Sequence, residues 1–273
     1  MGILYNRLMI ILNEEVPGSA YYHIALMMLE RLGSLSEIPI GRMAELCAVS
    51  KSTISKFIRA LGYEDYKDFR EAAIFEENKY QNDSNYVTNV MGFLDRHSLA
   101  TYVDTVCADV RATCEGIDLA AVDRLAHDLV RYEKVAAFGL MFSETAAIDL
   151  QTKLGYNGKF IITNMNDSKQ DRFIREADED TLIIVFSESG RFIDKYGSMI
   201  DDFSEKDVFD RTRARVVLVS SNDEMLHDRR VSYGVKIRHT RDLRTHSFTY
   251  QVVTDLIVYR YRELVHRLGV MLA

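Results

Sequence analysis

Four short, continuously apolar runs in the second half of the chain constrain its fold more than any other feature. They occupy residues 135–138, 160–162, 182–186 and 216–219, and amphipathic stretches of helix length separate them. A strand buried on both faces is apolar throughout, and strands that alternate with helices build parallel sheets covered by helices. The pattern therefore predicts a three-layer α/β domain with a parallel sheet.

The first half of the chain has helical periodicity instead. From residue 5 to about residue 75, apolar residues recur every three or four positions, as at Ile24 and Met28, which predicts an all-α domain. A polar stretch at residues 77–89 is rich in Asn and Asp, and helical spacing resumes over residues 90–114. These two segments are expected to form a linker and a connecting helix.

The expected organisation has two domains, since a chain of 273 residues exceeds the usual size of one. Residues 1–78 are assigned to the all-α domain, residues 79–115 to the linker and connecting helix, and residues 116–273 to the α/β domain. The predicted fold class is α + α/β.

The composition excludes several classes of protein. Lys and Arg number 34 against 41 Asp and Glu, so the net charge is −7. This excludes a protein that coats nucleic acid or a membrane through an overall positive charge. A local basic patch is compatible with this sum. The apolar stretch at residues 8–12 is too short for a signal peptide or a membrane helix. We therefore expect a cytoplasmic protein without a membrane partner.

Neither a metal site nor a cofactor is predicted. Cys47, Cys107 and Cys114 contain no CxxC pair, so neither a disulfide framework nor a four-ligand zinc site is available. The seven histidines show no HxxxH or HxxE spacing, which would place two ligands on one helix face.

Residues 38–69 carry the most specific motif in the chain. A helix is expected from about residue 41 to residue 47, followed by a turn at Ala48 and Val49. A second helix begins after Ser50, whose hydroxyl can accept hydrogen bonds from the free amides of the first turn. Two short helices that cross steeply bury small and branched side chains, and this helix-turn-helix pattern is met by Ala44, Val49, Ile54 and Ile58.

The outward residues of the second helix suit a DNA groove. No carboxylate occurs from Lys51 to Gly62, short hydroxyls can reach phosphates and base edges, and cations can contact the backbone. The alternative is a solvated helix face without a ligand. Glu64, Asp65 and Asp68 follow and would repel phosphate, so they are expected to point away. The candidate DNA-binding residues are Ser50, Lys51, Ser52, Thr53, Ser55, Lys56 and Arg59.

This segment resembles the DNA-binding domain of the RpiR family of bacterial transcription regulators. Lys56 stands where the family usually has Arg, so the charge is kept but the bidentate geometry is not. The resemblance implies binding to double-stranded operator DNA. The family's pattern, roughly A-x-x-x-x-V-S-x-x-T-I-x-R-F-x-x-x-L-G-[FY], is matched by Ala44, Val49, Ser50, Thr53, Ile54, Phe57, Leu61, Gly62 and Tyr63.

RpiR regulators resemble sugar isomerase (SIS) domains in their second half, and this chain has the corresponding layout. Residues 138–146 and 186–192 follow two predicted strands and contain serines and glycine, where backbone amides and hydroxyls can hold an anion. The resemblance implies that Ser143, Ser187 and Ser189 hold a sugar phosphate and that Gly190 lets the backbone approach it.

Two residues depart from the SIS pattern at these junctions. Domains of this type commonly show G-x-G-x-S and S-x-S-G-x-[ST], but Met141 occupies the second glycine position and Phe192 replaces the final hydroxyl residue. Both changes weaken the phosphosugar interpretation, because Met141 would crowd a ligand and Phe192 donates no side-chain hydrogen bond. A role of Ser143 and Ser189 as helix N-caps is the alternative.

A basic run precedes a long apolar helix expected over residues 248–270. It could bind an anion directly, with Arg241 and Arg244 as candidate effector-binding residues, or it could be a solvated loop or a subunit contact. The run contains Lys236, Arg238, His239, Arg241, Arg244 and His246.

The predicted function is a transcription regulator whose SIS-like domain senses a phosphosugar or related anionic metabolite and alters operator binding. One alternative is a degenerate or repurposed SIS domain that serves oligomerisation. The other is a sugar-phosphate isomerase, with Glu144, Glu188 or His246 as the base. The helix-turn-helix disfavours an enzyme, and fold analogy alone assigns no reaction.

A homodimer or homotetramer is expected, because paired recognition helices must match paired half-sites. Ordinary core packing is the alternative role for the residues proposed at the interfaces. They are Tyr102, Val106 and Val110 after the linker, and Leu256, Tyr259, Leu264 and Leu268 near the C-terminus.

Overall fold

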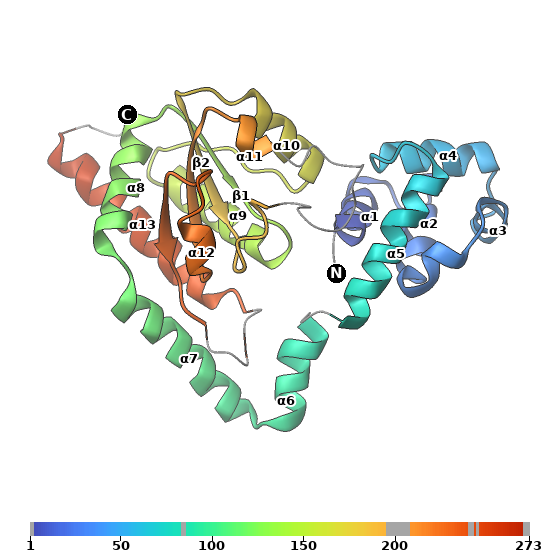
Figure 1. The fold of residues 1–273 in the computed structure, drawn as a ribbon, viewed down its shortest axis with the longest axis horizontal. Helices are drawn as coiled ribbons and strands as arrows, with labels where there is room; N and C mark the ends of the chain where they lie inside the picture. Colours follow the sequence, from blue (N-terminus) through green and yellow to red (C-terminus); the bar gives the residue numbers. More distant parts are fainter. Residues whose placement is uncertain (1–2, 83–85, 195–207, 240–242, 244–245, 270–273) are drawn as a thin grey trace. The chain divides into compact units, whose positions relative to one another are not determined.

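The computed structural model describes residues 3–82, 86–194, 208–239, 243 and 246–269. The chain divides into two compact units (Figure 1). The first comprises Met1–Asn85 together with Asn166–Ser168, and the second comprises Tyr86–Met165 together with Lys169–Ala273. Each unit has its own hydrophobic core.

The first unit is all α, as its periodicity predicts. Its core includes Ile24, Met28 and Phe57, which are fully buried, and the ring of Tyr21 meets that of Phe57 edge-on at 5.2 Å. Its elements are α1 (Ile3–Glu14), α2 (Ala20–Leu29), the 3-10 helix η1 (Leu32–Glu37), α3 (Ile40–Leu46), α4 (Lys51–Ala60) and α5 (Tyr66–Asn82).

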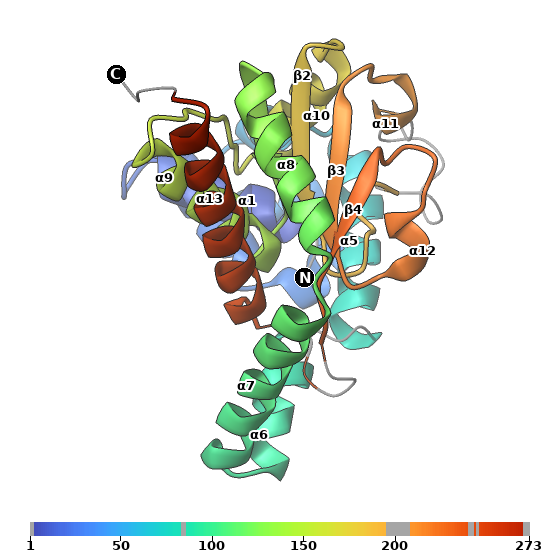
Figure 2. The same cartoon turned by 90° about the vertical axis from the view of Figure 1, so that its left-hand side faces the viewer.

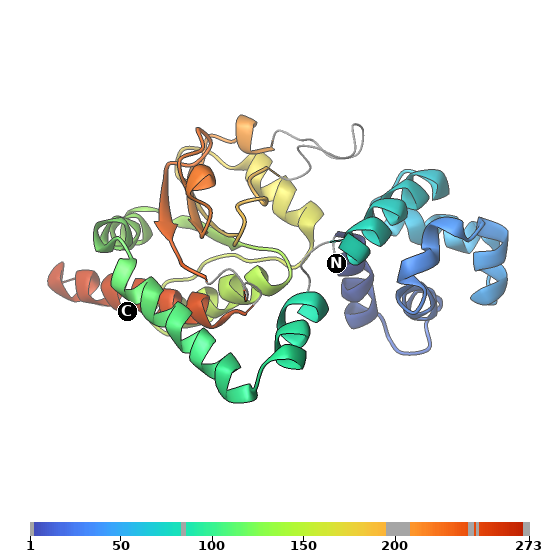
Figure 3. The same cartoon turned by 60° about the horizontal axis from the view of Figure 1, so that its bottom comes forward.

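The segment expected to be a linker is largely helical. Helix α5 continues to Asn82 because Glu, Lys and Gln in this stretch are good helix formers. A π-helical turn, η2 (Val87–Met91), leads into α6 (Gly92–Arg96). The expectation of one helix over residues 90–114 is wrong, since α6 ends at Arg96 and the extended His97 follows it. Ser98 then caps α7 (Leu99–Gly116) by accepting from the Thr101 amide at 3.1 Å. Figure 3 shows the bend between α6 and α7.

The second unit contains a four-stranded parallel sheet in the order β1-β2-β3-β4, which confirms the predicted parallel arrangement. Residues 160–162 form no strand. Ile162 makes one isolated bridge to Ala136 of the outer strand. Phe160 and Ile162 are 81% and 50% exposed, whereas Ile161 between them packs in the core. The strands are β1 (Lys134–Phe138), β2 (Thr181–Phe186), β3 (Arg215–Ser220) and β4 (Tyr233–Lys236).

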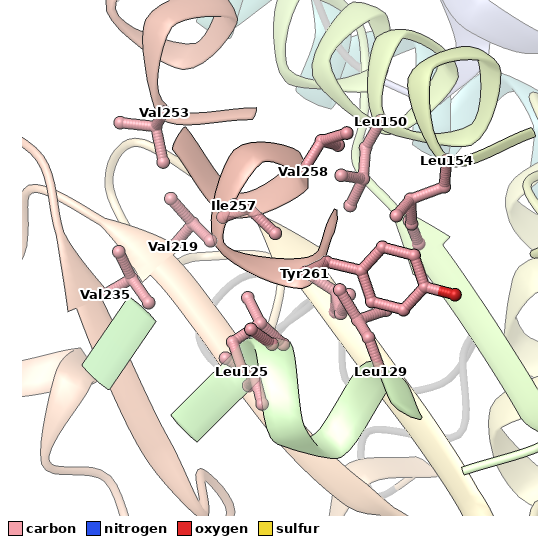
Figure 4. Packing of buried hydrophobic residues seen from close by; sticks show 14 of the residues in the cluster. Leu125, Leu129, Leu150, Leu154, Val219, Val235, Val253, Ile257, Val258 and Tyr261 are labelled. Atoms are coloured by element: carbon pink, nitrogen blue, oxygen red, sulfur yellow. The ribbon is translucent and has the colours of Figure 1, made fainter. Parts of the chain in front are cut away.

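Helices cover both faces of the sheet, which gives the predicted three layers (Figure 2). Alternate residues of β1 point to opposite faces, so Ala137 belongs to one core and Phe138 to the other. Helices α8 (Leu119–Arg131), α9 (Phe142–Gly155) and α13 (Phe248–Arg267) pack on one face, and Figure 4 shows Leu125, Leu150 and Ile257 from these helices in that core. The other face holds α10 (Asp167–Glu176), α11 (Val208–Arg211) and α12 (Asp223–Leu226).

Within the residues that the structure describes, no helix combines the length and apolar character needed to span a bilayer. Cys47, Cys107 and Cys114 carry free thiols, of which Cys107 and Cys114 are exposed on α7.

Candidate functional site

Helices α3 and α4 form the predicted helix-turn-helix. The turn between them places Ala48 in a left-handed conformation with φ +52°, and the amide of Val49 donates to the carbonyl of Ala44 at 3.0 Å. Ser50 is the N-cap of α4, since its hydroxyl accepts from the Thr53 amide at 3.0 Å. The Ser50 cap was predicted from sequence, whereas the left-handed Ala48 and the hydrogen bond between Val49 and Ala44 are findings of the structure.

The face of α4 opposite its buried side carries free cations. Ile54, Phe57 and Ile58 are buried, which leaves five candidate DNA-binding residues exposed and Thr53 and Ser55 half-buried. Among the described residues, the three cations on this face form no ion pair. Unpaired cations can approach phosphates without first breaking a local contact. The five exposed residues are Ser50, Lys51, Ser52, Lys56 and Arg59.

Three hydroxyls of the candidate interface are engaged locally. The hydroxyls of Ser50 and Thr53 lie 2.9 Å apart, and Ser55 donates to the Lys51 carbonyl at 3.1 Å. A hydroxyl oxygen keeps acceptor capacity after donating. The three hydroxyls therefore stabilise α4 itself, and the positive charge offered to DNA comes from the exposed lysines and arginine.

Two acidic side chains after α4 accept hydrogen bonds from backbone amides around the start of α5. The carboxylate of Asp65 accepts from the amides of Lys67 and Asp68 at 2.8 and 3.0 Å. Asp68 is buried and accepts from the Glu64 amide at 2.8 Å, and burial raises the pKa of its carboxyl group. Both carboxylates thus serve the α5 N-terminus, as expected of groups that must not meet phosphate.

The two serine-containing junctions lie at the same edge of the sheet. Strands β1 and β2 are parallel neighbours, with Phe138 beside Val185, so the junctions that follow them emerge side by side. The carboxyl edge of a parallel sheet is where α/β proteins bind ligands. The structure therefore brings together the segments around Ser143 and Ser189.

The first junction is a tight turn into α9. A Cβ on Gly139 would lie 2.5 Å from the Ser143 carbonyl oxygen, so this position needs glycine. Met141 has φ +56° and ψ −118°, a conformation that favours glycine and costs a side chain about 1–3 kcal/mol. Met141 also occupies the N-cap position, so the alternative role of Ser143 as N-cap is wrong.

The second junction, residues 187–190, is tied to the end of β3. Ser187 is buried, and its hydroxyl accepts from the Phe192 amide at 3.3 Å. The carbonyl of Glu188 accepts from the Ser220 hydroxyl at 2.8 Å, and that of Ser189 accepts from the Asn222 side chain at 2.9 Å. Ser189 lies in a turn and caps no described helix, so its hydroxyl is available to a ligand.

The space beside Gly190 is filled by the protein itself. Gly190 has φ +73°, and a Cβ there would lie 2.4 Å from the Cβ of Met225 in α12. The glycine thus permits close packing of α12, whereas the sequence suggested approach to a ligand. Phe192 is likewise a core residue, 4% exposed, whose ring meets that of Phe209 edge-on at 5.9 Å.

Two buried polar side chains that the sequence did not single out for binding border the Ser143 junction. The hydroxyl of Tyr250 and one carboxyl oxygen of Glu144 have no hydrogen-bond partner in the described part of the chain. Burial raises the pKa of Tyr250, the Ser143 hydroxyl lowers it, and the Glu188 charge raises it. The Tyr250 ring meets the ring of Phe186, the last residue of β2, edge-on at 5.6 Å. An apolar helix pattern hides such a residue, because tyrosine also suits a core.

Glu144 makes stability depend on pH. Burial raises its pKa to about 7 from an ordinary value of 4.5, so the folded protein holds a proton that the unfolded chain releases. The free energy of unfolding must then fall as pH rises from about 4.5 to about 7.

Replacement of Glu144 by glutamine is therefore expected to raise the free energy of unfolding by about 2 kcal/mol at pH 8 and to change little at pH 4. Urea unfolding followed at both pH values measures the difference. The exposed Glu224 provides a control, since Glu224→Gln removes the same charge without a buried carboxyl group. An equal gain at pH 4 and pH 8 would contradict the assignment.

Among the described residues of the basic run before α13, the side chains have different surroundings. Lys236 pairs with Asp223 at 2.5 Å, and the Arg238 guanidinium lies over Gly116, where a Cβ would meet its Nε at 2.6 Å. His239 and His246 turn inward to the buried Asp109. Of the described members of this run, Lys236 is therefore ion-paired and the two histidine side chains are buried, whereas Arg238 is exposed. Arg241 and Arg244, the candidate effector-binding residues of this run, lie outside the described residues.

The expected interface residues divide between core and surface. Val106 packs in a small core with Phe93, and Leu264 is 7% exposed in the main core. Both residues therefore serve core packing and not an interface. Tyr259 and Leu268 are each 56% exposed and keep the interface hypothesis open.

The sequence of this chain is similar to that of a curated transcription regulator. The chain is 22% identical over 195 residues to an uncharacterized HTH-type transcriptional regulator in the aarA 3' region of Providencia stuartii, covering 70% of this chain and 67% of that protein. No family model matches the chain.

Among solved structures, the Vibrio vulnificus NanR protein complexed with ManNAc-6P matches with a TM-score of 0.50 at 17% identity, covering 97% of this chain and 94% of that one. The sugar isomerase domain of an RpiR transcription factor from Sphaerobacter thermophilus has a TM-score of 0.46 at 13% identity, covering 64% of this chain and 100% of that one. The curated relative and the NanR fold agree with the class predicted from sequence, a helix-turn-helix transcription regulator with a SIS-like second domain.

Proposed function

We propose that this regulator binds operator DNA through α4 and senses a sugar phosphate or related anionic metabolite at the carboxyl edge of its parallel sheet. The observation that carries the first part is the exposed face of α4, on which Lys51, Lys56 and Arg59 are free of ion pairs among the described residues. Such a face gives electrostatic attraction to phosphates in a protein whose total charge is negative.

The effector part of the proposal rests on Ser143 and Ser189. Both are half-buried at neighbouring strand ends, where hydroxyls and backbone amides can hold a phosphate. Ser187 and Gly190 shape the second turn, and Arg241 and Arg244 are retained as proposed anion contacts. The complex of NanR with ManNAc-6P supports a phosphosugar as the ligand class.

The proposed mechanism is allosteric. Residues 1–78 would bind DNA, residues 79–115 would connect, and residues 116–273 would bind the effector and form a homodimer or homotetramer. An effector that prefers one arrangement of paired sensor domains changes the separation of two recognition helices. That separation must match half-sites about 34–36 Å apart or a multiple of this distance.

Selection of bound fragments from a genomic DNA library by the purified protein tests the DNA-binding function. We expect recovery of a defined site with two related half-sites. Recovery of random fragments at low salt, lost at about 150 mM salt, would indicate only nonspecific binding and would contradict operator recognition.

Thermal stability against a panel of sugar phosphates and other small anions tests the effector site. A ligand at 100 times its dissociation constant that binds only the folded state adds about 2.7 kcal/mol. We expect one sugar phosphate to raise the melting temperature and Ser189→Ala to reduce that rise.

Thr145→Ala is the matched control for this panel. Thr145 is exposed in the first turn of α9, and its hydroxyl donates to the Phe142 carbonyl, so its loss should leave the ligand response unchanged. If no sugar phosphate alters the melting temperature, the phosphosugar proposal is wrong, and the alternative of a SIS-like domain that serves oligomerisation becomes the one to test.

Catalysis is not part of the proposed function, although one observation favours the isomerase alternative. Glu144, with a pKa of about 7 beside Ser143, could act as a base near neutral pH. Conversion of any ligand found in the panel, abolished by Glu144→Gln, would establish an enzyme.

A further inference from the structure

A buried carboxylate and two buried imidazoles meet beneath the α/β unit's surface. Asp109 lies on α7, His239 follows β4 and His246 precedes α13, and their side chains are only 1–2% exposed. His246 Nε2 lies 2.9 Å from Asp109 Oδ2, and His239 Nδ1 lies 3.7 Å from the same atom. One ligand atom from each residue falls within 4.8 Å of the other two.

Neighbouring contacts hold the three residues in place. Thr113, one turn beyond Asp109 on α7, accepts from the Arg238 amide at 2.8 Å and donates to the Arg238 carbonyl at 3.1 Å. These bonds fix the residue before His239 against α7. The two imidazole rings meet edge-on at 4.9 Å. The cluster is thus a positioned set of side chains on three separate segments.

One ring nitrogen of the cluster is unsatisfied. His246 Nδ1 is buried and has no hydrogen-bond partner in the part of the chain that is described, in a side chain that is 1% exposed. Buried polar atoms are nearly always paired with protein, water or a ligand. The nitrogen of the same ring that faces Asp109 is Nε2, so the case for a group bound among the three side chains rests on the convergence of their ligand atoms within 4.8 Å.

We propose that Asp109, His239 and His246 bind one divalent transition-metal ion, with zinc as the best match. Zinc binds imidazole nitrogen at about 2.0–2.1 Å and carboxylate oxygen at about 2.0–2.2 Å, which separates tetrahedral ligands by about 3.4 Å. The observed separations of 2.9 and 3.7 Å bracket this value. Two imidazoles exclude magnesium and calcium, which prefer oxygen ligands.

The ion would join Asp109 on α7 to His239, which follows β4, and to His246, which precedes α13. Two neutral imidazoles and one carboxylate carry a charge of −1, so a divalent ion leaves the buried cluster with +1 and a fourth position for water or an anion. Because the ligands must be deprotonated, metal binding should weaken as pH falls.

Equilibrium dialysis of the full chain against zinc, after removal of metal with a chelator, tests the proposal. We expect one zinc ion per chain, a higher melting temperature with zinc, no such effect of magnesium, and at least a tenfold loss of affinity in Asp109→Asn and in His246→Gln. Cobalt(II) bound to the unaltered protein should show the intense visible absorption of a tetrahedral site.

His127→Gln is the matched control, since His127 is exposed on α8, outside the cluster, and its ring nitrogen lies 2.8 Å from the Asp123 carbonyl oxygen. Circular dichroism establishes whether each variant folds. If Asp109→Asn and His246→Gln do not fold, the cobalt spectrum of the unaltered protein tests for the metal site. The proposal is overturned if the unaltered protein binds no stoichiometric zinc, or if folded variants bind it as tightly as the unaltered protein.

Discussion

Replacement of both Lys51 and Lys56 by alanine is expected to lower operator affinity about 100-fold, because each lost phosphate contact costs roughly a factor of ten. Both side chains are exposed on α4. The stem of Lys51 lies over Gly41 at the start of α3, where a Cβ would meet its Cε at 3.2 Å. This contact positions the ammonium group before DNA arrives, so little ordering is needed on binding.

Salt dependence distinguishes this electrostatic role from general damage. The slope of log affinity against log salt should fall by about two in the double variant, one for each phosphate contact. Fluorescence anisotropy with the selected operator at several salt concentrations measures both quantities. Lys67→Ala is the control, because Lys67 on α5 is 86% exposed and removes one charge from the same domain. An unchanged slope in the double variant would remove α4 from the DNA interface.

Replacement of Gly190 by alanine is expected to lower the free energy of unfolding by about 3 kcal/mol. Two costs add, since the left-handed backbone at φ +73° disfavours a side chain by about 1–2 kcal/mol and the overlap with Met225 costs about 1–3 kcal/mol. The same change should disturb residues 187–190 and thereby reduce the response to the effector. Urea unfolding measures the loss.

A second substitution separates the two costs. In the double variant Gly190→Ala with Met225→Gly, the two Met225 atoms nearest to the new Cβ, its own Cβ and Cγ, are gone. Relative to Met225→Gly alone, the double variant should therefore lose only the backbone part of the stability that Gly190→Ala loses in the unaltered protein. Gly155→Ala is the control, because a Cβ there meets nothing within 4 Å and its φ is not positive. That variant should be slightly more stable, since alanine is the better helix former. Equal losses at Gly155 and Gly190 would refute the packing argument.

Much of the fold followed from sequence because its signals are local. The hydroxyl of Ser50 reaches the Thr53 amide three residues away, and the alternating faces of β1 depend only on strand geometry. The helix-turn-helix, the parallel sheet and the two serine-containing junctions were therefore predictable. The missing strand at residues 160–162 was not, because an apolar run becomes a strand only when it pairs over several residues with a neighbouring strand, and this segment makes a single bridge to β1.

The candidate site also combines features that local sequence determines with features that depend on tertiary structure. Sequence determined which hydroxyls and glycines stand at the strand ends, since these depend on residue order alone. Tertiary structure decided that Met225 fills the space beside Gly190 and that Ser187 serves its own turn. It also brought His246 to Asp109 across 137 residues of chain. Local spacing cannot specify such pairs, because their separation in space depends on the path of the whole chain between them.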